Sequence, residues 1–386
     1  MDKSEKSPLY ELLRAALNPS APKSLSSNLT NAEWLQIHSE CLKQLTTGIV
    51  YKAICDLPKE QRPPFDIILQ WASEAETIKG HNKLLNDEAA RLTELFAAQG
   101  HKTAVLKGPA NARLYPDTYI RQAGDIDLWV DGGKESVLSL LKQMGYEIDD
   151  MNLISQHHVH LHPTTNNILV EIHYRSSSGN LNLFTSKRLL RFLESEIQNV
   201  EKVPEGFCVP SIKFALAMQL SHIQRHFFTG GIGFKQLIDY YILLQHASEN
   251  DRSEIHARLS RFGLLKTCSA LMWLMQHVFG LESEKMLCKP DEKRGKKMLA
   301  KVCDGGNFGK HRQAEIHDTY KKYVRRFLRK RREALRLFWF DPVEVLGGEL
   351  VYWKTFIHSI PLRIKTRKLS LWDMYHKQDL KKEADL

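Results

Sequence analysis

The chain has 386 residues, 42% hydrophobic and 26% charged, which is the balance of an ordinary globular protein long enough for two or three domains. Its formal net charge of +10 favours an anionic partner such as a nucleotide, a nucleic acid or an acidic membrane surface, although a basic tail on a soluble protein would give the same total. No apolar run approaches the roughly 20 residues of a membrane span, and the first residues lack the apolar segment of a secretory signal.

The cysteines indicate the compartment. They are dispersed without a C-x-x-C pair, which disfavours a disulfide framework or a zinc knuckle and fits a reducing environment. We therefore expect a cytoplasmic protein, with peripheral contact at a membrane as a further option. The cysteines are Cys41, Cys55, Cys208, Cys268, Cys288 and Cys303.

Residues 1–64 are expected to form an N-terminal helical region. Thr30 and Glu33 have the spacing of a capping box, in which the threonine hydroxyl accepts from the glutamate N–H and the carboxylate reaches back. An inward-facing apolar stripe should follow this helix start. Its members are Trp34, Ile37, Cys41 and Leu45.

Residues 65–207 are expected to form the core of the protein. Helical periodicity over residues 65–99 leads directly into a short apolar strand over residues 102–106. This step from helix to strand places both elements in one domain with the residues that follow.

The next residues, Lys107 and Gly108, are a candidate phosphate site. Pro109 stands where proline is best tolerated, at the start of a helix that we expect to end near residue 115. A helix start offers free backbone N–H groups, and glycine lets a phosphate approach closely.

Two carboxylates, Asp125 and Asp127, stand in the next predicted strand. Side chains two residues apart on a strand share one face, so both acids point the same way, while Ile126, Leu128 and Val130 can be buried on the other. Like charges held together must be neutralised, and a divalent metal bound to oxygen ligands is the obvious candidate.

A third carboxylate, Glu171, shares a strand face with His173 in a predicted hairpin. Paired aspartates with a third acid on a later strand are what two-metal phosphoryl or nucleotidyl transfer requires. The third acid either ligates a metal or accepts the proton of the attacking hydroxyl. The first hairpin strand alternates His158, His160 and His162, which could bind a metal. A polar exposed face is the favoured interpretation, because a flat strand rarely wraps an ion without other ligands.

Residues 208–303 are expected to form a helical domain that closes the cleft. His222 and His226 are four apart on a helix and therefore face the same way. Packing or hydrogen bonding near the cleft is favoured for them over catalysis or substrate contact. Lys235 and Asp239 are also four apart and are expected to form a structural ion pair that positions their helix.

Residues 304–386 form the last expected region, which is basic and partly helical. Lysines and arginines crowd residues 321–332, and aromatic residues follow at 338–340. A solvated helix is the simplest interpretation, but residues 321–340 also suit an anionic membrane surface or another polyanion. Nucleic acid is less favoured, because no RNA- or DNA-binding motif is present.

Taken together, these motifs resemble the uncharacterised nucleotidyltransferase branch of the DNA polymerase beta-type superfamily. The likeness covers roughly residues 80–245. Where that superfamily usually has a Gly-Ser turn for the triphosphate, this chain has Lys107 and Gly108. The likeness is carried by residues 105–108, 114–115, 121, 124–128, 170–173, 222–226 and 237–239.

We expect an α+β fold, in which a small mixed β-sheet nucleotidyltransferase core has N-terminal helices and a mainly helical C-terminal region. The resemblance implies transfer of an NMP from an NTP to a hydroxyl or phosphate of a small-molecule or protein acceptor, with Mg²⁺ or Mn²⁺ as cofactor and pyrophosphate as product. Asp125, Asp127 and Glu171 would hold the metals and act in catalysis. The nucleotide would be bound by Lys107, Gly108 and Arg121, and the candidate cleft residues are His173, His222, His226, Lys235 and Asp239.

Two other hypotheses remain open. The chain could be a degenerate nucleotide-binding or regulatory module that acts through its basic C-terminal region. The three acids argue against this, because without a metal they would only repel one another. A nucleic-acid enzyme of the terminal-transferase kind is the third hypothesis. It predicts salt-dependent RNA or DNA binding that weakens when Arg325 to Arg332 are neutralised.

Overall fold

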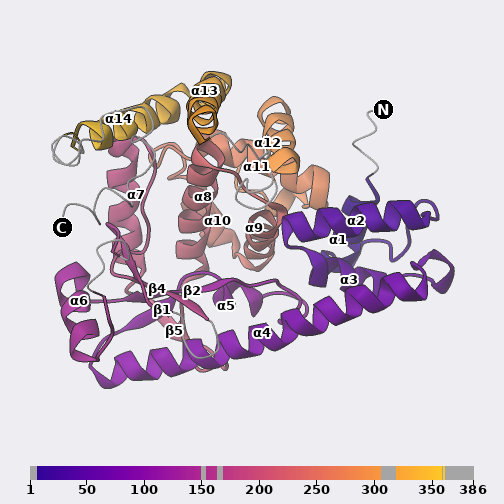
Figure 1. The fold of residues 1–386 in the computed structure, drawn as a ribbon, viewed down its shortest axis with the longest axis horizontal. Coiled ribbons are helices and arrows are strands. Elements are labelled where there is room, and N and C mark those ends of the chain that lie inside the picture. Colours follow the sequence, from indigo (N-terminus) through magenta and orange to yellow (C-terminus); the bar gives the residue numbers. More distant parts are fainter. Residues whose placement is uncertain (1–6, 149–153, 163–167, 306–318, 359, 361–386) are drawn as a thin grey trace.

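The computed structural model describes residues 7–148, 154–162, 168–305, 319–358 and 360, which form a mixed α+β fold, mostly helical (Figure 1). The first half contains α1 (Pro8–Leu17), α2 (Asn31–Gln44), α3 (Thr47–Asp56), η1 (Lys59–Gln61), α4 (Phe65–Ala98), β1 (Thr103–Val105), α5 (Pro109–Ala112), β2 (Asp125–Val130), α6 (Gly133–Gln143), β3 (His158–His160) and β4 (Leu169–His173). The second contains α7 (Leu183–Glu196), β5 (Val200–Lys202), β6 (Cys208–Pro210), α8 (Ile212–Thr229), α9 (Phe234–His246), α10 (Glu249–His256), α11 (Leu265–Phe279), η2 (Ser283–Lys285), α12 (Glu292–Gly305), α13 (Thr319–Phe338) and α14 (Pro342–His358).

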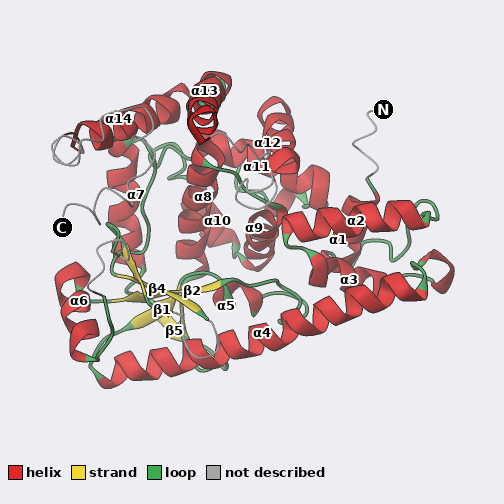
Figure 2. Cartoon of the chain, in the orientation of Figure 1, coloured by secondary structure: helices red, strands yellow, loops and turns green. Residues whose placement is uncertain are grey.

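The main sheet is small and mixed, with the strand order β1-β2-β4-β3. Its strands are drawn in yellow in Figure 2. Strand β2 is antiparallel to β1 and parallel to β4, and β3 is antiparallel to β4. A separate two-stranded sheet joins β5 to β6. The expected α+β class with a small mixed sheet is therefore confirmed.

One face of the main sheet packs on α4, which runs along its side in Figure 1. Ile126, Leu128 and Val130 are fully buried there, in one core with α4 residues such as Leu85 and Phe96. Burial of each such side chain contributes about 1.5–3 kcal/mol. The alternation along β2 therefore leaves the opposite face, toward α8 and α9, to polar side chains.

The helices before and after the sheet share a second core. It combines apolar residues of α1–α3 with those of α8, α9, α11 and α12. The predicted capping box is present, since Thr30 Oγ1 accepts from Glu33 N at 3.3 Å and Glu33 Oε2 accepts from Thr30 N at 2.8 Å. Of the predicted stripe, Leu45 is the exception: it ends α2 in a left-handed conformation with φ 55°. The expected boundaries at residues 64, 207 and 303 remain predictions.

The helices α13 and α14 lie over the side of the molecule away from α4 (Figure 1). Much of the predicted basic run falls outside the described side chains, which begin again at residue 328. Residues 306–318, between α12 and α13, also lie outside the described residues. Among the described helices, none combines the length and apolarity needed to cross a membrane.

Candidate active site

The polar face of the sheet gathers the predicted carboxylates. Strands β2 and β4 pair in parallel, with Asp127 opposite Glu171 and Trp129 opposite His173. Paired residues on neighbouring strands project from the same face, and so do residues two apart on one strand. The register therefore places Asp125, Asp127, Glu171 and His173 on one face.

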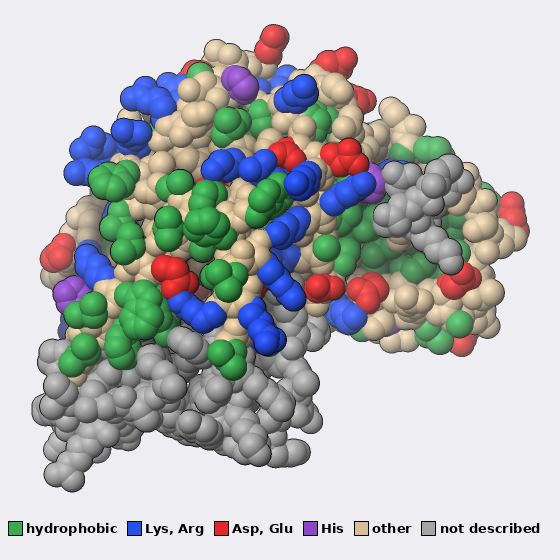
Figure 3. All heavy atoms as spheres, turned by 90° about the horizontal axis from the view of Figure 1, so that it is seen from above, with side chains coloured by type: hydrophobic (Ala, Val, Ile, Leu, Met, Phe, Trp, Pro, Cys, Tyr) green, Lys and Arg blue, Asp and Glu red, His purple; other side chains and the backbone are tan. Residues whose placement is uncertain are grey.

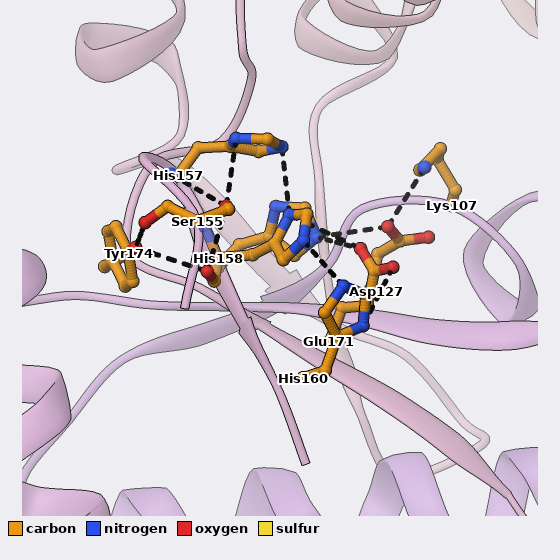
Figure 4. Close-up of polar contacts among 9 residues, drawn as sticks. Lys107, Asp127, Ser155, His157, His158, His160, Glu171 and Tyr174 are labelled. Carbon is orange, nitrogen blue, oxygen red and sulfur yellow. Dashed lines mark hydrogen bonds and ion pairs between the residues drawn. The ribbon is translucent and has the colours of Figure 1, made fainter. Parts of the chain in front are cut away.

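Asp127 lies at the centre of this group and is only 1% exposed. Its Oδ1 is 3.0 Å from Lys107 Nζ and 3.1 Å from His173 Nε2. The same His173 nitrogen lies 3.2 Å from Glu171 Oε2. Burial by itself would raise the pKa of Asp127, but Lys107 and the hydrogen bond from His173 outweigh it and hold that pKa below its usual range. Asp127 is therefore ionised, and Figure 4 shows its contact with Lys107.

The pKa values of the two basic partners, His173 and Lys107, shift in the direction that favours their charged forms. Burial would lower the pKa of His173, yet its hydrogen bonds to Asp127 and Glu171 raise it. Burial would likewise lower the pKa of Lys107, whereas the charge of Asp127 raises it. The chain's own cations thus neutralise part of the acidic charge. This corrects the expectation that the three acids would only repel one another without a metal.

Asp125 has a different environment. It is partly buried, and among the described residues its carboxylate makes no hydrogen bond or ion pair. The charge of Asp127, followed by burial, raises the pKa of Asp125. Asp125 is therefore the acid that a bound divalent cation would stabilise most.

The turn before α5 approaches β2 closely. Gly108 has φ 61° and ψ −112°, and a Cβ at this position would lie 2.9 Å from the carbonyl oxygen of Asp125. Glycine suits this place because it alone combines a positive φ with no side chain. The helix expected to reach residue 115 ends at Ala112, a single turn too short for a useful dipole. What the turn offers an anion is the Lys107 ammonium and close backbone approach.

A family model described as an uncharacterised nucleotidyltransferase matches residues 30–280. The chain belongs to this family. The match is wider than the resemblance over residues 80–245, since it also takes in α2, α3 and α11. Comparison with curated proteins and with solved structures gave no significant match.

In this member of the nucleotidyltransferase family, Arg121 does not lie where a direct phosphate contact needs it. Its Nε and Nη2 are 2.7 and 2.8 Å from the two carboxylate oxygens of Asp239, and the residue is only 4% exposed. Tyr115 donates to the same carboxylate at 2.7 Å. The bidentate pair ties the loop before β2 to α9, so Arg121 positions the loop. The predicted ion pair between Lys235 and Asp239 was wrong, because Asp239 pairs with Arg121.

Lys235 is consequently left as a buried cation, 8% exposed. Among the described residues its ammonium makes no hydrogen bond or ion pair. Burial, followed by the charge of Arg121, lowers the pKa of Lys235 to about 8, while Asp239 and Asp125 oppose that shift. Lys235 is therefore an uncommitted positive charge within electrostatic range of Asp125.

His222 and His226 lie on α8, and both are within electrostatic range of Lys107. Their ring centroids are 4.2 Å apart. Burial, followed by the charge of Lys107, lowers the pKa of both, to about 4 for His226, so both rings are neutral near pH 7. An amide pair holds α8 against α5, because Asn111 and Gln219 each donate to the other at 3.0 and 2.8 Å.

The face of β3 was predicted to be polar and exposed, but its histidines also contact one another. His158 Nδ1 lies 2.9 Å from His157 Nε2, and His158 Nε2 lies 3.1 Å from His160 Nε2. Burial lowers the pKa of His157 to about 3 and that of His158 to about 4, so both are neutral near pH 7. His162, by contrast, is exposed. His157 was not predicted to belong to this group, because it precedes the alternating stretch of the sequence.

The donor set on this face fits a divalent cation. Asp127, Glu171 and His173 each offer a ligand atom, and these atoms lie within 4.8 Å of one another. Asp125 adds a fourth donor from the same face. Carboxylate oxygens are the ligands that Mg²⁺ and Mn²⁺ prefer.

Proposed function

We propose that this protein is a Mg²⁺- or Mn²⁺-dependent nucleotidyltransferase. It moves an NMP from an NTP to a hydroxyl or phosphate of a small-molecule or protein acceptor and releases pyrophosphate. The observation that carries this proposal is the shared face of β2 and β4, where three carboxylates stand beside Lys107. Membership of the nucleotidyltransferase family supports the same reaction class.

The three carboxylates have different roles in the proposed reaction. Asp125 and Asp127 would hold the divalent cation, which would neutralise phosphate charge when bound. The acceptor oxygen forms a bond to the α-phosphorus of the NTP, the bond from that phosphorus to the bridging oxygen breaks, and pyrophosphate leaves with the electron pair. Glu171 accepts the acceptor's proton, a role that suits its side chain because it is 20% exposed and therefore reachable.

The triphosphate is bound by two lysines and a backbone turn. Lys107 stands beside Asp127, and Gly108 permits close approach of the phosphate to the main chain. Lys235 adds a charge that no other described group neutralises. Arg121 contributes indirectly, by fixing the loop that leads into β2 through its pair with Asp239.

Affinity for the NTP should fall as the pH rises through about 8, because the pKa of Lys235 is lowered to about 8 and its ammonium then loses the proton that attracts phosphate. A charge-assisted hydrogen bond contributes about 1.5–3 kcal/mol, so Lys235→Met should raise KM for the NTP by roughly 10- to 100-fold at neutral pH. Lys235→Arg stays protonated and should remove the rise in KM on the alkaline side. A wild-type KM that is flat on both sides of pH 8 would contradict this role.

The reaction itself is tested with labelled ATP, CTP, GTP and UTP, supplied with magnesium and the protein to a cell extract. Mass spectrometry should find an acceptor that has gained an NMP, and pyrophosphate should appear in equal amount. Nucleotide binding by calorimetry without pyrophosphate release under any acceptor would favour the non-catalytic module. Salt-dependent extension of added RNA or DNA would favour the terminal-transferase hypothesis.

We also propose that α14 contacts an anionic membrane surface. Its exposed face carries large apolar side chains spaced three or four residues apart, each 43–68% exposed. Soluble proteins seldom expose such a continuous apolar stripe on their surface. The neighbouring helix α13 carries exposed basic side chains, including Arg332 and Arg336, and Figure 3 shows lysines and arginines near apolar side chains on this side of the molecule, as in helices that bind at an anionic interface. The stripe consists of Val343, Leu346, Leu350, Trp353 and Ile357.

The protein should therefore sediment with vesicles that contain an anionic lipid, and much less with vesicles of neutral lipid alone. Replacing Leu346 and Leu350 by serine removes apolar area and should weaken this binding by about tenfold or more. Phe65→Ser is the matched control, because Phe65 is 78% exposed at the far side of the molecule on α4. Equal loss with both variants, or no vesicle binding by the wild type, would contradict the membrane contact.

A further inference from the structure

We propose that His158, His160 and Glu171 bind a divalent transition-metal ion of the zinc class, beside the carboxylate site. The antiparallel register of β3 and β4 sets His158 opposite His173 and His160 opposite Glu171. These side chains therefore project from the face that carries Asp125 and Asp127. A flat strand rarely binds an ion with its own side chains alone, and here Glu171 of β4 supplies a further ligand beside the histidines of β3.

The spacing of the donor atoms suits such an ion. One ligand atom from each of His158, His160 and Glu171 lies within 4.8 Å of the other two. A tetrahedral ion with bonds of about 2.0–2.1 Å requires ligand atoms about 3.3–3.4 Å apart. The Nε2 atoms of His158 and His160 are 3.1 Å apart, so small side-chain rotations suffice.

The hydrogen bonding of the cluster also points to a cation. Both ring nitrogens of His158 face other imidazole nitrogens, His157 Nε2 and His160 Nε2. A neutral imidazole has a single N–H, so at least one of these contacts depends on a proton supplied from the other ring. A metal ion would satisfy the lone pairs that these facing imidazoles leave unpaired.

His157 would orient the ligand His158 from behind. Ser155 Oγ lies 3.3 Å from His157 Nδ1, and His157 Nε2 lies 2.9 Å from His158 Nδ1 (Figure 4). The same Nδ1 of His158 also lies 3.5 Å from Glu171 Oε2, whereas Nε2 is the atom that faces His160. Hydrogen bonding of the second ring nitrogen is the usual device that fixes a ligating histidine.

The two oxygens of Glu171 allow it to serve both positions. Oε2 lies 3.2 Å from His173 Nε2 and 3.5 Å from His158 Nδ1, whereas Oε1 lies 3.5 Å from His160 Nδ1. The carboxylates offer oxygen donors that suit Mg²⁺, and the imidazoles offer nitrogen donors that suit zinc-class ions. Three protein ligands leave a coordination position for water or a substrate oxygen, as catalytic rather than structural sites do.

The test uses the full chain, freed of metal with a chelator and titrated with Co²⁺, whose visible absorption reports four-coordinate binding. We expect one Co²⁺ per chain, displaced by Zn²⁺. Replacing a residue that only hydrogen-bonds to a metal ligand typically lowers metal affinity by about 10- to 100-fold. Loss of a ligand itself, in His160→Ala or His158→Ala, should therefore weaken Co²⁺ binding by at least about 100-fold. His160 is exposed, so its replacement should leave the fold intact.

Two control variants make the outcome specific. His162→Ala removes an exposed imidazole just beyond β3 and should bind Co²⁺ as the wild type does. Asp125→Asn should keep the Co²⁺ spectrum even where it abolishes nucleotidyl transfer, which separates this site from the proposed function. Wild-type affinity in both His158→Ala and His160→Ala would overturn the proposal. Loss of the spectrum in Asp125→Asn alone would also overturn it, by placing the ion among the carboxylates.

Discussion

Asp127→Asn and Asp125→Asn should both abolish nucleotidyl transfer, yet change the stability of the metal-free protein in opposite directions. Asp127 is buried and faces Lys107 and His173. Neutralising one member of a buried pair leaves the other without compensation, which typically costs about 3–5 kcal/mol. We therefore expect Asp127→Asn to lower the free energy of unfolding.

Asp125→Asn should instead raise the free energy of unfolding of the metal-free protein. The charge of Asp127 raises the pKa of Asp125 in the folded state. A carboxylate with a raised folded-state pKa lowers stability at every pH above its unfolded pKa, because its ionised form is disfavoured in the fold. Asparagine at position 125 has no charge to repel, so the penalty disappears at neutral pH.

Urea unfolding at neutral pH, with and without Mg²⁺, measures both stability changes, and pyrophosphate release measures transfer. Loss of a group that holds charge in the transition state costs about 10²–10³-fold in rate, and loss of a cation ligand should cost at least as much. Mg²⁺ should stabilise the wild type but neither variant. Retained turnover in Asp127→Asn would refute its catalytic role. Stability shifts of the same sign in both variants would refute the electrostatic account.

Gly108→Ala should damage both stability and activity. The backbone at this position has a positive φ that residues other than glycine rarely adopt. Forcing alanine into it should cost about 1–3 kcal/mol. The added Cβ would stand 2.9 Å from the carbonyl oxygen of Asp125, so the turn or β2 must move. A displacement of about 1 Å near the reacting groups can cost about 10²-fold in rate.

Gly124→Ala is the matched control for this substitution. Gly124 immediately precedes Asp125, but a Cβ there meets no atom within 4 Å. We expect this variant to keep wild-type activity and stability within about 0.5 kcal/mol. The comparison uses urea unfolding and the rate of pyrophosphate release. Equal effects at the two glycines would show that the close approach of Gly108 to β2 has no special role.

Elements specified by neighbouring residues were predictable from sequence. The Thr30–Glu33 capping box, the long helix α4 and the alternation of β2 each depend on contacts within a few residues or on one repeated spacing. Such signals survive in the folded protein because local geometry and burial favour the same conformation.

Which charged side chains would pair with each other was less predictable from sequence. Asp239 was expected to pair with Lys235, one helical turn away, but it pairs with Arg121, 118 residues away. A helical spacing of four residues brings two side chains together only weakly in water. The buried, bidentate contact with Arg121 offers two hydrogen bonds and a desolvated charge pair, and its geometry exists only after α9 packs near the loop before β2.

The sequence by itself determined that β2 would turn two acids to one face, because side-chain direction on a strand follows from backbone geometry alone. It also indicated the family, through short motifs that the wider match over residues 30–280 bears out. The tertiary structure decided which charges meet. The pairing of β3 with β4 brought the histidines beside Glu171, and the packing of α9 left Lys235 without a hydrogen bond or ion pair to any residue that the structure describes. Those contacts join residues far apart in the chain, and their energies depend on burial that no local pattern encodes.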